Sequence, residues 1–123
     1  MVPPGMPPRI LIVEDEPILA FALEEYLKSA GFAIAGVAGR LPAALSAIAG
    51  LVFDAAVLDA NLAGVSAAPA AEALTARGVP FVVVSGYLPE QQQGAFSGGP
   101  RLQKPCRPEE LERALRGVLA GAG

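Results

Sequence analysis

Histidine and tryptophan are both absent from this chain of 123 residues. Without histidine the chain cannot use Ser–His or Cys–His nucleophilic catalysis, bind a metal through imidazole, or form a phosphohistidine of its own. Its one cysteine, Cys106, cannot make an internal disulfide, which is typical of proteins in a reducing compartment. Large classes of enzymes and metal sites are therefore excluded from the start.

Positive charge is also scarce. The chain has 9 basic residues, of which only Lys28 and Lys104 are lysine, against 12 acidic ones, and its formal net charge is −3. Proteins that bind nucleic acid usually present a basic face, because phosphate contacts supply much of their affinity. No cluster of basic residues occurs here, so we do not expect direct binding to nucleic acid.

Long hydrophobic runs are missing too, since no segment approaches the roughly 20 apolar residues that cross a bilayer. Residues 1–8 are rich in proline and lack the basic and apolar regions of a signal peptide. Hydrophobic residues nevertheless make up 53% of the chain, which indicates a compact core. We expect a cytoplasmic protein with a proline-rich tail (1–8) and one domain (9–123), without membrane contact or an output domain.

Strand-like and helix-like segments alternate along the chain. Short apolar runs with the composition of strands occupy residues 9–13, 33–37, 55–58, 80–84 and, in a more polar form, 101–103. Helical spacing of apolar residues is found at 17–30, 42–49, 67–77 and from 108 onward. Residues 87–99 hold proline, glycine and three glutamines without an apolar stripe, so we expect at most a marginal helix there.

Five such alternations predict an α/β fold with an open, doubly wound parallel sheet. Five strands favour the flavodoxin-like order 2-1-3-4-5. In sheets of this kind the functional site lies at the carboxyl ends of the strands, where the strand order reverses. Here that point falls between the first and third strands.

Five polar residues follow the predicted strands directly: Glu14, Asp15, Asp59, Ser85 and Lys104. Three carboxylates close together need a cation, and oxygen ligands without histidine or cysteine favour Mg²⁺, with Mn²⁺ as a substitute. One carboxylate would remain free to form an acyl phosphate. The serine hydroxyl and the lysine ammonium would supply a hydrogen bond and a positive charge to the phosphoryl oxygens.

This set, with Pro105 after the lysine, resembles the active site of response-regulator receiver domains of two-component signalling, from residue 9 to about residue 120. The resemblance implies that Asp59 is the phosphoacceptor. It also implies that Asp15 binds Mg²⁺ directly, Glu14 binds it through water, and the backbone carbonyl of Asn61 completes the metal shell.

The same resemblance implies that Ser85 is the switch hydroxyl and that Lys104 pairs with the phosphoryl group, usually before a cis proline. Gly64 matches the glycine of the loop after the acceptor. Such a domain catalyses only its own phosphorylation and dephosphorylation. It takes its phosphoryl group from the phosphohistidine of a sensor histidine kinase and passes the signal to a histidine phosphotransfer protein or another protein partner.

The segment Pro-Phe-Val-Val-Val-Ser-Gly-Tyr at 80–87 resembles the fourth-strand signature of the FATGUY subgroup, with serine in place of threonine. Members of that subgroup are typically single receivers that work with HWE-type or related kinases. Many receivers carry an aromatic residue three positions before the lysine, whereas this chain has Arg101. We therefore expect Tyr87 to act as a switch residue beside Ser85, although packing alone would also account for it.

Other interpretations stay open on the residues alone. The chain could keep the receiver fold as an unphosphorylated interaction module. A haloacid-type phosphatase would carry Asp-x-Asp on its first strand, and a flavodoxin-like nucleotide binder would need a glycine-rich loop there; neither is present. Taken singly, the acidic residues could simply lie in solvated turns, and Lys104 could point to solvent. Cys106 could have no role in the site.

Overall fold

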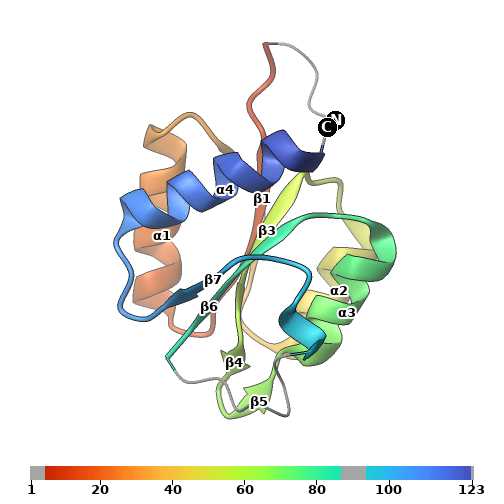
Figure 1. Ribbon diagram of the computed structural model, residues 1–123. Coiled ribbons are helices and arrows are strands. Elements are labelled where there is room, and N and C mark those ends of the chain that lie inside the picture. The colour runs from red at the N-terminus through yellow and green to blue at the C-terminus, as the bar shows by residue number, and fades with distance from the viewer. Residues whose placement is uncertain (1–4, 87–93, 123) are drawn as a thin grey trace.

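The computed structural model describes residues 5–86 and 94–122. Five parallel strands form its main sheet: β1 (Arg9–Val13), β2 (Ala33–Ala38), β3 (Ala55–Asp59), β6 (Phe81–Ser85) and β7 (Arg101–Gln103). Their order across the sheet is β2-β1-β3-β6-β7, and every pairing is parallel. The predicted order 2-1-3-4-5 is therefore confirmed, with the polar strand at an edge (Figure 1).

Four helices cover the two faces of this sheet: α1 (Pro17–Ser29), α2 (Leu41–Gly50), α3 (Ala68–Arg77) and α4 (Pro108–Ala122). Helices α1 and α4 lie on one face, and α2 and α3 on the other (Figure 1). All four have a proline in their first two positions, where its missing N–H costs nothing. Within the described residues no helix is both long and apolar enough to span a membrane.

The sheet divides the core into two clusters. Along β1, Ile10 and Ile12 belong to the cluster under α1 and α4, while Leu11 and Val13 belong to the cluster under α2 and α3. Successive side chains of a strand point to opposite faces, and both faces here are covered by helices. This is why the central strands are apolar at nearly every position instead of alternating with polar residues.

One short hairpin was not predicted. Strands β4 (Asn61–Leu62) and β5 (Val65–Ser66) pair antiparallel directly after β3. The turn between them contains Ala63 and Gly64, both with positive φ, at 54° and 86°. The hairpin therefore holds the loop beside the carboxyl end of β3 in one defined shape.

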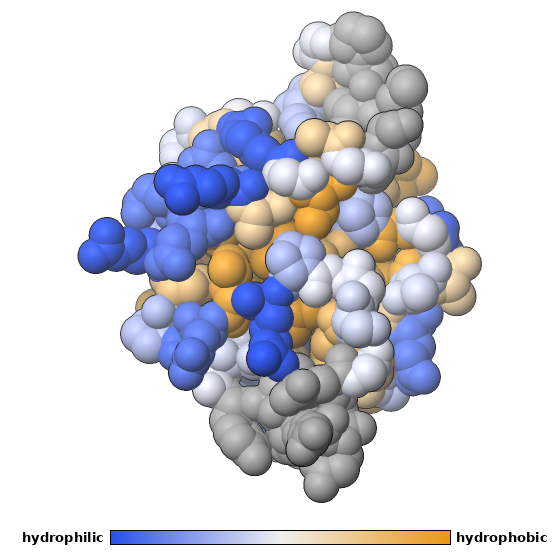
Figure 2. Space-filling model, in the orientation of Figure 1, coloured by the Kyte–Doolittle hydropathy of each residue, from blue (hydrophilic) through white to orange (hydrophobic). Residues whose placement is uncertain are grey.

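A polar clip joins the C-terminal part of α1 to residues 112–116 of α4. The Tyr26 hydroxyl donates to Glu112 at 2.8 Å, and Arg116 donates to Glu112 at 3.0 Å. Arg116 also donates to the carbonyl of Ala30 at 2.7 Å and lies over the ring of Phe32, 4.6 Å from its centre. Figure 2 shows hydrophilic residues gathered over α4, with hydrophobic residues exposed in the middle of the same face.

Candidate functional site

The predicted acidic residues meet at the carboxyl edge of the sheet. Asp59 is the last residue of β3 and is only 5% exposed. Glu14 and Asp15 follow β1, whose residue Val13 pairs with Leu58 beside Asp59. Ligand oxygens of the three acids all lie within 4.8 Å of one another. The parallel register thus brings together residues that are more than forty positions apart in the chain.

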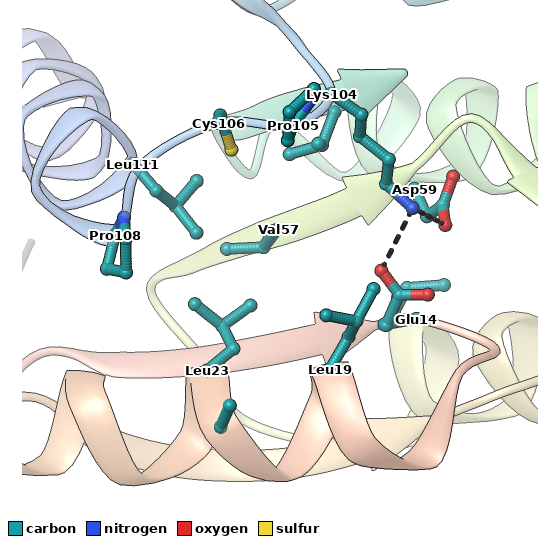
Figure 3. A pocket seen from close by; sticks show the side chains of 13 residues that line it. Glu14, Leu19, Leu23, Val57, Asp59, Lys104, Pro105, Cys106, Pro108 and Leu111 are labelled. Atoms are coloured by element: carbon teal, nitrogen blue, oxygen red, sulfur yellow. Dashed lines mark hydrogen bonds and ion pairs between the residues drawn. The ribbon is translucent and has the colours of Figure 1, made fainter. Parts of the chain in front are cut away.

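Lys104 reaches into this cluster from the opposite side (Figure 3). Its Nζ lies 2.8 Å from Oδ2 of Asp59 and 3.3 Å from Oε1 of Glu14. The backbone N–H of Lys104 donates to the carbonyl of Ser85 at 2.8 Å, and the peptide bond from Lys104 to Pro105 is cis. The lysine is therefore fixed to the sheet by its backbone and to the acids by its side chain.

The loop after β3 binds the acids through backbone N–H groups. Asn61 N–H donates to Oδ1 of Asp59 at 3.1 Å, and Ala63 N–H donates to Oδ2 of Asp15 at 3.2 Å. The Asn61 side chain accepts a hydrogen bond from Gly64 N–H at 2.8 Å, which closes the turn. The left-handed conformation of Ala63 costs roughly 1–2 kcal/mol, and its contact with Asp15 offsets part of that cost.

The electrostatics of the cluster show that one lysine does not balance three acids. Burial, the largest cause, and the negative charge of Asp59 together raise the pKa of Glu14 to about 7. They outweigh the hydrogen bond that Glu14 accepts from Glu16 N–H and the attraction of Lys104, which both lower it. Burial opposes the charge of Lys104, but its bond to Asp59 raises the pKa of the ammonium overall. Excess negative charge on closely spaced oxygens suits a hard cation such as Mg²⁺.

The remaining predicted site residues lie at the same edge or outside the described residues. Ser85 is buried, with 6% exposure, and follows Val84, which pairs with Asp59. Arg101 is exposed on β7. Tyr87, the second expected switch residue, lies outside the described residues. The structure therefore places Glu14, Asp15, Asp59, Ser85, Lys104 and Asn61 at one edge of the sheet, while their roles there stay predictions.

Two features of the site were missed from the sequence. The N–H of Ala63 contacts Asp15, yet alanine has no preference for a left-handed turn that could have marked it. An apolar pocket of about 400 Å³ also opens beside Asp59, lined on one side by Leu19 and Leu23 of α1. The only signal for it in the sequence was that these leucines share a helical stripe, which is usually a core feature.

Comparison with known proteins identifies the family. The sequence profile of the response regulator receiver domain matches residues 10–116. The chain belongs to the receiver domain family. Receiver domains are signalling modules of two-component systems that interact with histidine kinases and phosphotransfer proteins. No curated protein sequence matches this receiver domain significantly.

Solved structures agree with that assignment. SdrG from Sphingomonas melonis Fr1, a solution structure, is 36% identical, with a TM-score of 0.76 over 92% of this chain and 97% of that one. A CheY-like receiver from Methanospirillum hungatei JF-1 shares the fold at 23% identity and a TM-score of 0.84, over 94% and 96%. The receiver domain of histidine kinase PA1611 from Pseudomonas aeruginosa PAO1, with magnesium in its active site cleft, has 24% identity and a TM-score of 0.78, over 93% and 98%.

Proposed function

We propose that this receiver domain accepts a phosphoryl group on Asp59 from the phosphohistidine of a sensor histidine kinase. The observation that supports it most strongly is the contact of Asp59 with Lys104 at 2.8 Å inside a cluster of acids. A carboxylate oxygen of Asp59 bonds to phosphorus as the phosphorus–nitrogen bond of the donor breaks. The electron pair of that bond returns to the imidazole, and an acyl phosphate remains on the receiver.

The site residues have separate roles in holding the metal ion and in compensating the charge of the phosphoryl group. Asp15 and Asp59, with the backbone carbonyl of Asn61, would hold Mg²⁺ directly, and Glu14 would hold it through water. When bound, Mg²⁺ neutralises charge on the transferring phosphoryl oxygens. Lys104 pairs with one of those oxygens and is already held beside Asp59. The Ser85 hydroxyl then bonds to the phosphoryl group, and this new contact biases the surface around β6 and β7.

The finer family assignment rests on sequence features. The segment 80–87 with Arg101 in place of an aromatic residue supports membership of the FATGUY subgroup, and hence an HWE-type kinase as donor. The signal would leave through a histidine phosphotransfer protein or a downstream effector. A receiver fold kept only as an unphosphorylated interaction module is less well supported, because such a module has no need for three converging acids and a lysine.

The first test is labelling by a small phosphodonor such as acetyl phosphate. We expect one phosphoryl group per chain in the presence of Mg²⁺, because the cation offsets the charge of the acids and the donor together. A chelator should abolish labelling, and added Mn²⁺ should restore it. Intact mass spectrometry with peptide mapping measures the label. Equal labelling with chelator, or a label on a residue other than Asp59, would contradict the proposal.

Replacing Lys104 by methionine should change two measurements in opposite directions. Labelling by acetyl phosphate should slow about 100-fold, because the positive charge that stabilises the transferring oxygens is lost. Mg²⁺ should bind more tightly, because the acids lose their only close cation among the described residues. Calorimetry and rapid-quench labelling measure the two effects.

The matched control for this substitution is Lys28→Met. Lys28 is the only other lysine in the chain, and it forms exposed ion pairs with Glu24 and Glu25 on α1. The labelling rate and the Mg²⁺ affinity of Lys28→Met should both equal those of the wild type. If Lys104→Met lowered Mg²⁺ affinity and labelling together, the lysine would be organising the metal site instead of binding the phosphoryl group.

A further inference from the structure

The main sheet has two edges, and they differ in how they are protected against another chain. The edge strand β7 has only three residues, of which Arg101 and Gln103 are exposed and polar. Short length and charged side chains are features that prevent an edge strand from pairing with another chain. The other edge strand, β2, has six residues, Ala-Ile-Ala-Gly-Val-Ala, without charge or proline. β2 is therefore the edge of this sheet to which another strand can be added.

The open side of β2 presents backbone polar groups at Val37. The carbonyl of Ala38 accepts a hydrogen bond from Glu14 N–H at 3.0 Å, so the polar groups of Ala38 face β1. Successive residues of a strand turn these groups to opposite sides, so the N–H and C=O of Val37 face the open edge. The register with β1 shifts between Ile34 and Gly36, but it is regular from Gly36 to Ala38. Among the described residues no strand pairs with this side of β2, which leaves Val37 available in regular strand geometry.

Apolar side chains flank this edge on the α1 side of the sheet. Val37 is 46% exposed, and it pairs with Ile12, which belongs to the core cluster under α1 and α4. Phe21 of α1 is 64% exposed. It points away from Leu19 and Leu23, which line the pocket, because residues two apart on a helix are about 200° apart. Since α1 packs on β1 and β2 while α4 packs on β3 and β6, Phe21 lies on the β2 side of α1.

We propose that β2 is a dimerisation edge, at which two copies of this chain pair antiparallel about a two-fold axis beside Val37. The two valines exchange both backbone hydrogen bonds, and one continuous sheet then runs through both copies. Gly36 of each copy faces Ala38 of the other, so only small residues flank the central pair. The two α1 helices lie side by side above the junction, with Phe21 of each copy in the contact between them.

Charge favours a second copy as the occupant of this edge. The segment from α1 to α2 (17–50) contains two acidic and two basic residues, Glu24, Glu25, Lys28 and Arg40. It is therefore neutral, although the whole chain carries a net charge of −3. Two copies that meet through this segment bring no excess of like charge together, whereas a partner selected by its charge would find no excess charge to bind. An isologous contact of uncharged residues with themselves fits both facts.

Such a dimer leaves the candidate phosphorylation site free. The pocket and Lys104 lie on the α4 side of α1, and β2 lies on its other side. Because the strands of the two copies run in opposite directions, their Asp59 carboxylates lie at opposite ends of the joint sheet. Pairing at β2 is thus compatible with phosphoryl transfer to each copy, and it does not depend on that transfer.

The first test compares Val37→Lys with Val65→Lys by sedimentation over a series of protein concentrations. Val65 is a matched control, because it is 51% exposed and lies in β5, in the hairpin that follows β3. The wild type should form dimers, and Val37→Lys should raise the dissociation constant at least tenfold, because two ammonium groups then face each other across the axis. Val65→Lys should match the wild type.

Two results of this comparison would overturn the proposal. One is a wild type that stays monomeric up to about 1 mM, which is the dissociation constant of a very weak complex. The other is a Val37→Lys variant that forms dimers as readily as the wild type. Circular dichroism of both lysine variants should match the wild type, since each substitution replaces a side chain that is about half exposed.

A cross-linking test locates the contact. Cys106→Ser removes the only cysteine, and Val37→Cys or Val65→Cys is added to that variant. The Cα atoms of a hydrogen-bonded antiparallel pair lie about 5.5 Å apart, so a short bis-maleimide should join two Val37→Cys chains efficiently. Val65→Cys should give at least tenfold fewer joined chains. Dimers in solution without this cross-link, or equal cross-linking of the two variants, would refute pairing at β2.

Discussion

Asp59→Asn is expected to abolish phosphoryl labelling completely and to weaken Mg²⁺ binding. The amide has no anionic oxygen to attack phosphorus, and it removes one of three carboxylates from the cluster. The fold should be preserved, because asparagine has nearly the same shape and the substitution relieves repulsion with Glu14. We expect the free energy of unfolding to change by less than about 1 kcal/mol. Intact mass spectrometry measures the label, and urea unfolding measures the stability.

Asp54→Asn supplies the matched control, because Asp54 stands just before β3 and Asp59 ends it. The Asp54 carboxylate accepts a hydrogen bond from the backbone N–H of Arg9 at 2.7 Å, at the opposite end of the strand from the acids. Its loss should leave labelling and Mg²⁺ affinity unchanged. A label that persists in Asp59→Asn would mean that the phosphoacceptor is another residue, and the proposed function would fail.

The strand order and the site could be predicted from the sequence for the same physical reason. Strands covered on both faces must be apolar throughout, so each one stands out as a continuous run, and each ends where a polar residue first appears. Parallel strands place those ends at one edge of the sheet. Asp59 and Ser85 were therefore located by the ends of two apolar runs, and Lys104 by its place after the more polar edge strand. Bringing the three together required only the order of the strands.

The hairpin β4–β5 and the pocket could not be predicted in this way. Two-residue strands carry no periodicity, and the hairpin depends on a left-handed Ala63 held by the carboxylate of Asp15. The pocket depends on the distance between α1 and α4. These helices are joined by the hydrogen bond from Tyr26 to Glu112, two residues that are 86 positions apart in the chain. Features that depend on the spacing between elements leave no local pattern in the sequence.

Gly99→Ala is expected to destabilise the protein more than any other substitution considered for it. A Cβ at this position would overlap the carbonyl oxygen of Phe81, and it would lie 3.0 Å from the carbonyl carbon of the same residue, which is tighter than most such contacts. Neither partner can move easily, because Phe81 begins β6 and is 1% exposed, and Val83 N–H donates to the carbonyl of Pro100 at 2.8 Å. We expect a loss of at least about 4 kcal/mol, against a total of about 5–15 kcal/mol for a typical domain.

Gly117→Ala separates this close contact from the general effect of removing a glycine. Gly117 lies within α4, and a Cβ there would meet no atom within 4 Å. Alanine favours the helix over glycine by about 1 kcal/mol, so this variant should be more stable than the wild type. Urea unfolding followed by circular dichroism compares the three proteins. Equal midpoints for Gly99→Ala and the wild type would show that β6 and the segment before β7 can separate, and then Lys104, which follows β7, would not be held rigidly beside Asp59.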